Sequence, residues 1–122
     1  MDYFKKIGET LSARCGKGEL GDNFHAHIEE KNSPEALKSV SDRLVHVHLS
    51  ENDRGTPGTG QVNRTETFST LKQIQYDDWI VIEAFGRALP DLAAATRVWR
   101  DLFNDPKDVY TDGLSFIREG LA

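Results

Sequence analysis

Three side chains that commonly bind divalent metal ions follow predicted β-strands in this 122-residue chain: Asp22, His48 and Glu83. Two carboxylates and one imidazole suit a hard or borderline ion such as Mn²⁺, Mg²⁺ or Co²⁺. The chain contains a single cysteine, so a structural zinc site built from paired cysteines is excluded, whereas a zinc ion held by these three residues is not. The residue types therefore predict a site for one divalent metal ion.

Glu83 carries the strongest chemical argument of the three. It interrupts an apolar run that begins at Trp79, and a carboxylate buried in such a run must be paired or bound to a metal. His48 belongs to a His-x-His pair and could equally be a packed core residue. Asp22 lies in a Gly-Asp-Asn sequence, which is also common in turns. Taken singly, these two residues leave the structural interpretation open.

Alternating helices and strands must position these residues. Apolar spacing, capping residues, prolines and glycines delimit the elements. In the first half of the chain we expect a helix with Phe4, Ile7 and Leu11 on one face, a weak strand at 19–25 that runs into a loop, a helix with Ser33 as its cap, and a strand at 44–49. A loop at 55–60, a helix capped by Asn63 and a strand at 79–85 follow. The last two elements are a helix from Pro90, with Leu92, Thr96, Trp99 and Phe103 on one face, and a final helix marked by Tyr110, Leu114, Ile117 and Leu121. This alternation indicates an α/β fold with a parallel sheet, in one domain over residues 1–122.

Strand periodicity supports a shared site. Side chains alternate between the two faces of a strand, so His46 and His48 share a face, as do Trp79, Val81 and Glu83. If both faces point into a barrel, His48 and Glu83 project from neighbouring strands at the same level. The carboxyl ends of parallel strands are where sites form in such folds.

Charge and composition exclude several functions. The net charge is −5 and the sequence has no basic run, which argues against a nucleic-acid partner. Its apolar runs are far shorter than the ~20 residues of a membrane span, so no membrane partner is expected. No secretory signal is visible after Met1, and Cys15 has no partner for an internal disulfide. We therefore expect a cytoplasmic protein.

Several segments resemble the D-tagatose/D-psicose 3-epimerase family of xylose isomerase-like barrels. They are Asp-Asn-Phe-His-Ala-His-Ile-Glu-Glu at 22–30, His-Val-His-Leu-Ser-Glu-Asn-Asp-Arg at 46–54 with Pro-Gly-Thr-Gly at 57–60, Tyr-Asp-Asp-Trp-Ile-Val-Ile-Glu-Ala-Phe at 76–85, and Val-Trp-Arg-Asp at 98–101, which matches the last barrel helix of the family. The likeness covers about residues 22–122, the C-terminal portion of such a barrel. It implies a partial (β/α)₈ barrel with about three parallel strands and flanking helices.

The resemblance also implies roles for individual residues. Asp22 and His48 would bind the metal ion, and Glu83 would be both a ligand and a catalytic base. His25 and Arg54 would bind oxygen atoms of a sugar substrate. The implied reaction is proton transfer next to the metal-bound carbonyl of a ketose, through an enediolate, which epimerises or isomerises the sugar.

Part of the family pattern is absent from the sequence. A whole barrel has eight βα units and needs roughly 250 residues. The second catalytic glutamate has no counterpart, since neither Glu9 nor Glu19 ends a convincing strand. An open three-stranded barrel would also leave unpaired edges and an exposed apolar face. We therefore expect a homo-oligomer or pairing with a missing half-barrel.

Three other interpretations are open. The chain could be a catalytically inactive truncated barrel, or an interaction module, that at most binds a divalent metal ion. A cupin-like site is disfavoured because only two residues separate His48 from Glu51 and because helices are predicted. A phosphodiester-cleaving barrel would share His, Asp and Glu ligands, but the acidic charge and the closer epimerase motifs count against it.

Overall fold

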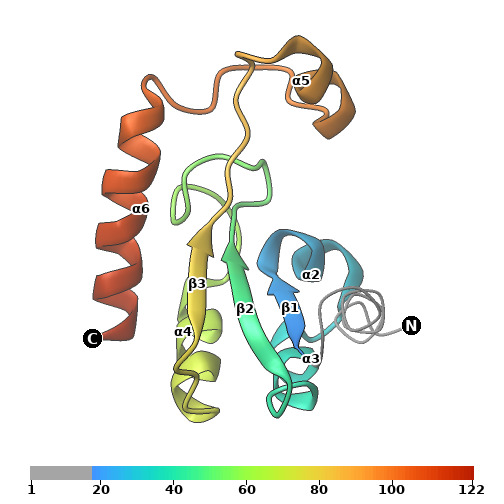
Figure 1. The fold of residues 1–122 in the computed structure, drawn as a ribbon, viewed down its shortest axis with the longest axis vertical. Helices are drawn as coiled ribbons and strands as arrows, with labels where there is room; N and C mark the ends of the chain where they lie inside the picture. Colours follow the sequence, from blue (N-terminus) through green and yellow to red (C-terminus); the bar gives the residue numbers. More distant parts are fainter. Residues whose placement is uncertain (1–17) are drawn as a thin grey trace.

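The three predicted strands pair side by side in one parallel sheet. In the computed structural model, which describes residues 18–122, β1 (Glu19–Asp22), β2 (Leu44–Leu49) and β3 (Trp79–Ile82) lie in the order β1-β2-β3 (Figure 1). The register places Asp22 opposite His48 and Leu49 opposite Ile82. The α/β class and the partial barrel of three parallel strands with flanking helices are therefore confirmed. The helix predicted near Phe4 lies outside the described residues.

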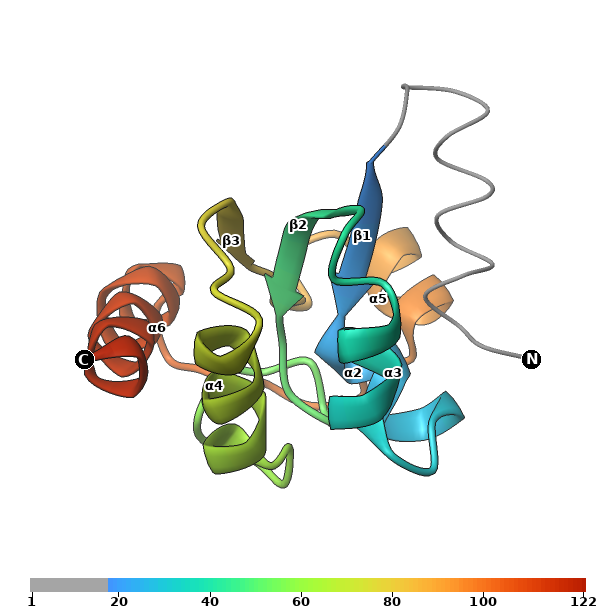
Figure 2. The same cartoon turned by 90° about the horizontal axis from the view of Figure 1, so that it is seen from below.

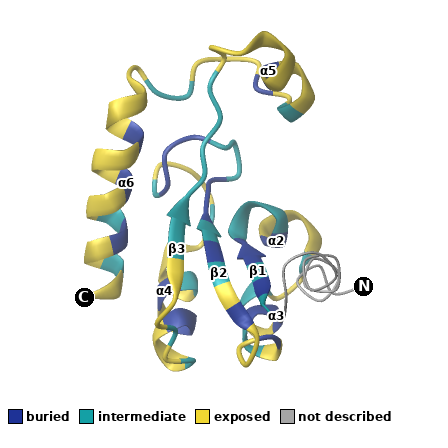
Figure 3. Ribbon diagram, in the orientation of Figure 1, coloured by how far each residue is buried: buried dark blue, intermediate teal, exposed yellow. Residues whose placement is uncertain are grey.

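Helices cover one face of this sheet. They are α2 (Asn23–Glu29), α3 (Ser33–Ser39), α4 (Arg64–Gln73) and α6 (Pro106–Leu121) (Figure 2). The core between sheet and helices is made of aliphatic and aromatic side chains, among them Ala26, Leu37, Val40, Leu44, Val47, Leu49, Phe68, Leu71 and Ile117. The short α5 (Pro90–Thr96) lies beyond the carboxyl ends of the strands and is mostly exposed (Figures 1 and 3). No helix within residues 18–122 is both long and apolar enough to cross a bilayer.

Helix α2 begins at Asn23, inside the segment 19–25 that we predicted as a weak strand, so β1 is shorter than expected. The carboxylate of Asp22 accepts the backbone N–H groups of Phe24 and His25, as an N-cap residue does. The cap of α3 was also predicted one residue too late, because Asn32 rather than Ser33 accepts the first helical N–H. These shifts follow from local side-chain acceptors that apolar spacing alone does not reveal.

The helix that starts at Pro90 is shorter than predicted. It ends at Thr96, because Arg97 adopts a left-handed backbone conformation with φ 58°. The guanidinium of Arg54 donates to the carbonyl of Thr96 and so occupies one of the acceptors that a longer helix would use. Trp99 and the rest of segment 98–101 therefore lie in the connection to α6, and the prediction that they are helical is wrong.

Of the four residues in the stripe predicted for α6, only Ile117 is buried. Gly113 and Ile117 are buried against the sheet and core, whereas Tyr110 and Leu114 are exposed. A Cβ atom on Gly113 would lie 2.8 Å from Cδ1 of Ile82. The close approach of α6 to β3 therefore favours glycine at this position, and a pattern based on large apolar residues misses such a contact.

The second face of the sheet is largely open within residues 18–122. Trp79 is 71% exposed and lies opposite His46 on this face. The rings of His46 and His48 meet edge to face with centroids 5.1 Å apart. Within residues 18–122, helices thus cover only one face of the sheet. The candidate metal ligands lie on the other face, away from the core.

Candidate metal centre

The carboxyl ends of the three strands bring Asp22, His48 and Glu83 together, as predicted. One ligand atom from each lies within 4.8 Å of those of the other two. The Nδ1 atom of His48 is 2.5 Å from Oε2 of Glu83 and 3.7 Å from Oδ2 of Asp22. Because the strands are parallel and adjacent, residues about 26 and 35 positions apart in the chain reach one point. All three side chains are therefore close enough to bind a single ion.

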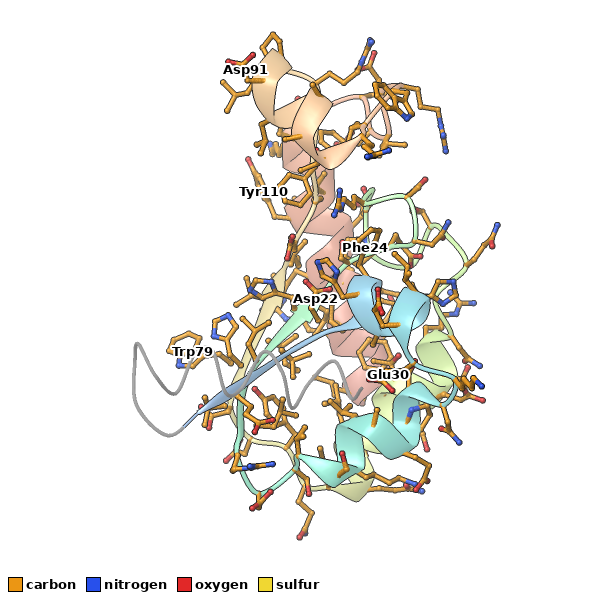
Figure 4. All side chains as sticks on the ribbon, turned by 90° about the vertical axis from the view of Figure 1, so that its right-hand side faces the viewer. Asp22, Phe24, Glu30, Trp79, Asp91 and Tyr110 are labelled. Carbon is orange, nitrogen blue, oxygen red and sulfur yellow. The ribbon has the colours of Figure 1, made fainter. Side chains whose placement is uncertain are left out.

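Asp22 divides its two oxygens between the fold and the site. It ends β1, is only 4% exposed, and lies at the start of α2 (Figure 4). Oδ1 accepts the N–H of Phe24 at 2.9 Å and the N–H of His25 at 3.3 Å. These bonds fix the carboxylate plane and leave Oδ2 facing His48. The helix cap therefore orients the predicted metal ligand.

Glu83 is held level with His48 by the backbone. Its N–H donates to the carbonyl of Leu49 at 3.0 Å, so strand pairing continues one residue beyond the end of β3. Asn23 fixes the other side, because its Oδ1 accepts the N–H of Ser50 at 2.7 Å and ties the start of α2 to the end of β2. Sequence analysis did not identify Asn23 as a positioning residue; its place directly after Asp22 was the only available signal.

Electrostatics at this point favour a cation. Burial raises the pKa of Asp22, and the negative charge of Glu83 and a hydrogen bond shared with it raise that pKa further; the N–H and ring of His25 act in the opposite direction. Burial, then the proximity of His48, lowers the pKa of His46. A buried carboxylate beside a second one is destabilised unless a proton or metal ion neutralises it. The donor set of two carboxylates and a neutral imidazole therefore fits a divalent ion.

His25 and Arg54, the predicted substrate-binding residues, lie next to this centre. The guanidinium carbon of Arg54 lies 4.1 Å from the ring centre of Phe24 and 5.3 Å from that of Phe85. His25 packs edge-on against Phe24, with ring centres 5.0 Å apart. Both residues therefore stand beside the ligands, and their contact with a sugar stays a prediction.

A buried glutamate that sequence analysis did not assign secures the loop above β2. Glu51 is 2% exposed, and its two oxygens accept the N–H groups of Gly58 at 2.8 Å and Val62 at 3.2 Å. The signal was a glutamate that precedes a glycine-rich loop. Glu19, by contrast, pairs with Arg43 at the opposite end of β1 and is remote from the metal ligands.

The fold agrees with comparisons to known proteins. A family model described as "Xylose isomerase-like TIM barrel" matches residues 20–120. This chain belongs to that family. The region shared with this barrel family contains all three candidate ligands and both predicted substrate-binding residues, and the barrel's strand ends are where its members build their sites.

Relatives within the barrel family are sugar epimerases. The chain is 35% identical over 102 residues to a probable ketose 3-epimerase of Synechocystis sp., covering 84% of this chain and 36% of that protein. It is 37% identical over 100 residues to an L-ribulose 3-epimerase of Methylomonas sp., covering 80% and 35%. The crystal structure of a D-allulose 3-epimerase from Methylomonas sp. in complex with D-allulose superimposes with a TM-score of 0.84 at 32% identity, over 98% of this chain and 43% of that one. The chain thus spans about a third of the length of these curated relatives.

Proposed function

We propose that this chain is part of a metal-dependent isomerase or epimerase that acts on a ketose sugar. The observation that carries the proposal is the convergence of Asp22, His48 and Glu83 within 4.8 Å at the carboxyl end of the sheet. The names of the relatives, ketose 3-epimerase and L-ribulose 3-epimerase, support the substrate class. Mn²⁺, Mg²⁺ and Co²⁺ are the ions that suit the donor set best.

A bound divalent ion would polarise the ketose carbonyl and its neighbouring hydroxyl, which makes the adjacent C–H bond more acidic. Asp22 would hold the ion with Oδ2, since Oδ1 is occupied by two backbone N–H groups. His48 would use Nδ1, which already faces both carboxylates. This assignment requires the proton of the neutral His48 ring to lie on Nε2.

Glu83 is the proposed base. Its side chain is 25% exposed, more open than that of Asp22, so one oxygen can reach a substrate while the other faces His48. Removal of the proton alpha to the carbonyl gives an enediolate, and reprotonation from the opposite face inverts the carbon. His25 and Arg54 would bind substrate oxygens. Within residues 18–122, no fourth acidic or imidazole side chain joins the three-residue group, so a second acid would have to come from elsewhere.

A Glu83→Gln variant tests the base directly. We expect epimerisation of ketohexoses such as D-fructose and D-allulose in the presence of Mn²⁺, Mg²⁺ or Co²⁺, with turnover reduced about 10²–10⁴-fold in Glu83→Gln. Glu119→Gln on the exposed side of α6 serves as the matched control and should retain full activity. Absence of turnover by the wild-type chain with every divalent ion would refute the enzymatic proposal.

The open sheet face favours a second candidate, a metal-binding but catalytically inactive part of a barrel. Trp79 on that face is 71% exposed, and β1 and β3 are both edge strands within the described part of the chain. An inactive chain would show a metal-dependent rise in melting temperature without turnover. The active and inactive candidates are therefore separated by measuring both quantities on one preparation.

The same open face supports a proposal about assembly. A second copy of this chain, or the missing half-barrel, would cover Trp79 and pair with an edge strand. Sedimentation velocity over a range of concentrations tests this arrangement. A monomer at all concentrations with a cooperative thermal melt would argue against an obligate partner.

A further inference from the structure

A cleft lies at the same end of the sheet as the candidate metal ligands. It has a volume of about 500 Å³ and lies between the start of α2, the loop after β2 and the segment that follows α5. Phe24 and His25, whose N–H groups cap onto Asp22, form one wall of the cleft, so it begins directly beside the centre. Figure 4 shows Phe24 on the side of Asp22 that faces α5.

The charges lining this cleft are mostly positive. Arg54, Arg97 and Arg100 line it together with a single carboxylate, that of Asp53. Asp53 pairs with Arg100 at 3.3 Å and also accepts the N–H of Gly55. In the described part of the chain, no ion pair neutralises Arg54 or Arg97. Arginine stays protonated at every physiological pH, so a chain whose net charge is −5 presents a cationic cleft here.

Arg54 lines the cleft, is packed between two aromatic rings, and has one N–H donor without a partner among residues 18–122. Its guanidinium stacks between Phe24 and Phe85 and donates to the carbonyl of Thr96. Its Nε–H is buried and has no hydrogen-bond partner among residues 18–122. A buried unpaired donor is costly, and a charged one prefers an anionic acceptor.

The segment that carries the other two arginines is anchored as well. Val98, which lies between them, is only 5% exposed, and its N–H donates to the carbonyl of Ala93 at 2.9 Å. Arg97 and Arg100 themselves are exposed, so their side chains can turn toward a ligand. Fixed backbone with adjustable guanidinium groups is the arrangement that suits recognition of carboxylate or phosphate oxygens.

We propose that this cleft binds an anionic group, a phosphate or a carboxylate, on the substrate whose carbonyl end lies at the metal centre. The proposal rests on the proposed function, because it takes the substrate to be a ketose. It predicts that an acidic or phosphorylated ketose binds more tightly than a neutral ketose such as D-allulose.

Inorganic phosphate added to the metal-free chain probes the cleft independently of the metal centre. Isothermal titration calorimetry in a buffer of low ionic strength should detect binding that weakens as salt is added. Arg97→Gln and Arg100→Gln should each lower the phosphate affinity roughly two- to fivefold. Arg118→Gln on α6 removes an equivalent exposed charge elsewhere and should leave the affinity unchanged.

Sugars then distinguish the two sources of negative charge. With Mn²⁺ present, fructose 6-phosphate, 5-keto-D-gluconate and D-allulose are titrated in turn. We expect at least one of the two anionic sugars to bind about tenfold more tightly than D-allulose, with the difference reduced in the Arg97→Gln, Arg100→Gln double variant. The stronger of the two identifies phosphate or carboxylate.

Failure of this proposal is distinguishable from failure of the metal site. Lack of phosphate binding, equal losses in Arg118→Gln and Arg97→Gln, or anionic sugars that bind no better than D-allulose would overturn the anion cleft. A rise in melting temperature with Mn²⁺ would stand in each of these cases, since none of the three arginines belongs to the ligand group.

Discussion

The variant Asp22→Asn separates two effects of the Asp22 carboxylate: its effect on the stability of the metal-free fold and its contribution to metal binding. The substitution keeps an oxygen that can accept the N–H groups of Phe24 and His25, so the cap of α2 is retained. It removes a carboxylate whose pKa is raised by burial and by Glu83. The metal-free variant should therefore be at least as stable as the wild-type chain at pH 7, although it loses one metal ligand.

The sign of the pH dependence follows from the same shift. A raised pKa in the folded state means that the ionised form of Asp22 is disfavoured by folding, so its cost is present at neutral pH. As the pH falls through the folded pKa toward the ordinary value of 3.8, the carboxyl becomes protonated and the cost disappears. The gain in stability of Asp22→Asn over wild type should therefore shrink as the pH is lowered.

Metal binding should change the stability of the folded chain more than the substitution itself does. An ion present at 100 times its dissociation constant stabilises the folded chain by about 2.7 kcal/mol. For a chain of 122 residues that corresponds to a rise in Tm of roughly 10 °C. We expect this rise in wild type on addition of Mn²⁺, measured by differential scanning fluorimetry, and its loss in Asp22→Asn.

Asp105→Asn provides the matched control. Asp105 is also an N-cap aspartate, with its carboxylate accepting the N–H of Lys107 at 2.8 Å, but it is exposed at the start of α6. It should keep the full metal-induced rise. If Asp22→Asn retains that rise, Asp22 is not a metal ligand. If the metal-free Asp22→Asn chain melts well below both wild type and Asp105→Asn at pH 7, the ionised carboxylate of Asp22 does not destabilise the fold.

Two further predictions concern the elements that support the centre. Glu51→Ala leaves the N–H groups of Gly58 and Val62 without their acceptor, so the free energy of unfolding should fall by about 1–3 kcal/mol in urea denaturation, with faster hydrogen exchange at both amides; unchanged exchange would contradict the role given to Glu51. Gly113→Leu places side-chain atoms against Ile82, where even a Cβ would approach to 2.8 Å, so we expect a loss of about 1–3 kcal/mol. An unaltered urea midpoint for this variant would show that α6 does not pack closely on β3.

Much of the site could be predicted because strand ends and chemistry are local properties. The apolar run broken by Glu83 and the His-x-His pattern place two candidate ligands, His48 and Glu83, on neighbouring strands, and the nearest side-chain atoms of these residues lie 2.5 Å apart. The prediction that Asn63 caps a helix is confirmed, since its side chain accepts the N–H of Glu66 at the start of α4. Such signals depend on residues a few positions apart, so a single sequence contains them.

Contacts between distant segments account for the errors in α5 and α6. The helix from Pro90 ends at Thr96 rather than continuing through Trp99, and the group that takes up the carbonyl of Thr96 comes from Arg54, 42 positions away. The face of α6 is set by the contact of Gly113 with Ile82, which no count of large apolar residues on α6 reveals. Neither partner is visible from the periodicity of its own segment.

The sequence by itself determined the βα order, the parallel sheet and the identity of the three acidic and imidazole side chains that end its strands. Only the tertiary structure brought the second oxygen of Asp22 to face His48, and His48 to face Glu83, because these three residues come from three different strands or strand ends. The tertiary structure likewise placed Arg54, Arg97 and Arg100 around one cleft. Charged residues from separate loops come close together only when the chain folds, because their separation in space does not depend on their separation in the sequence.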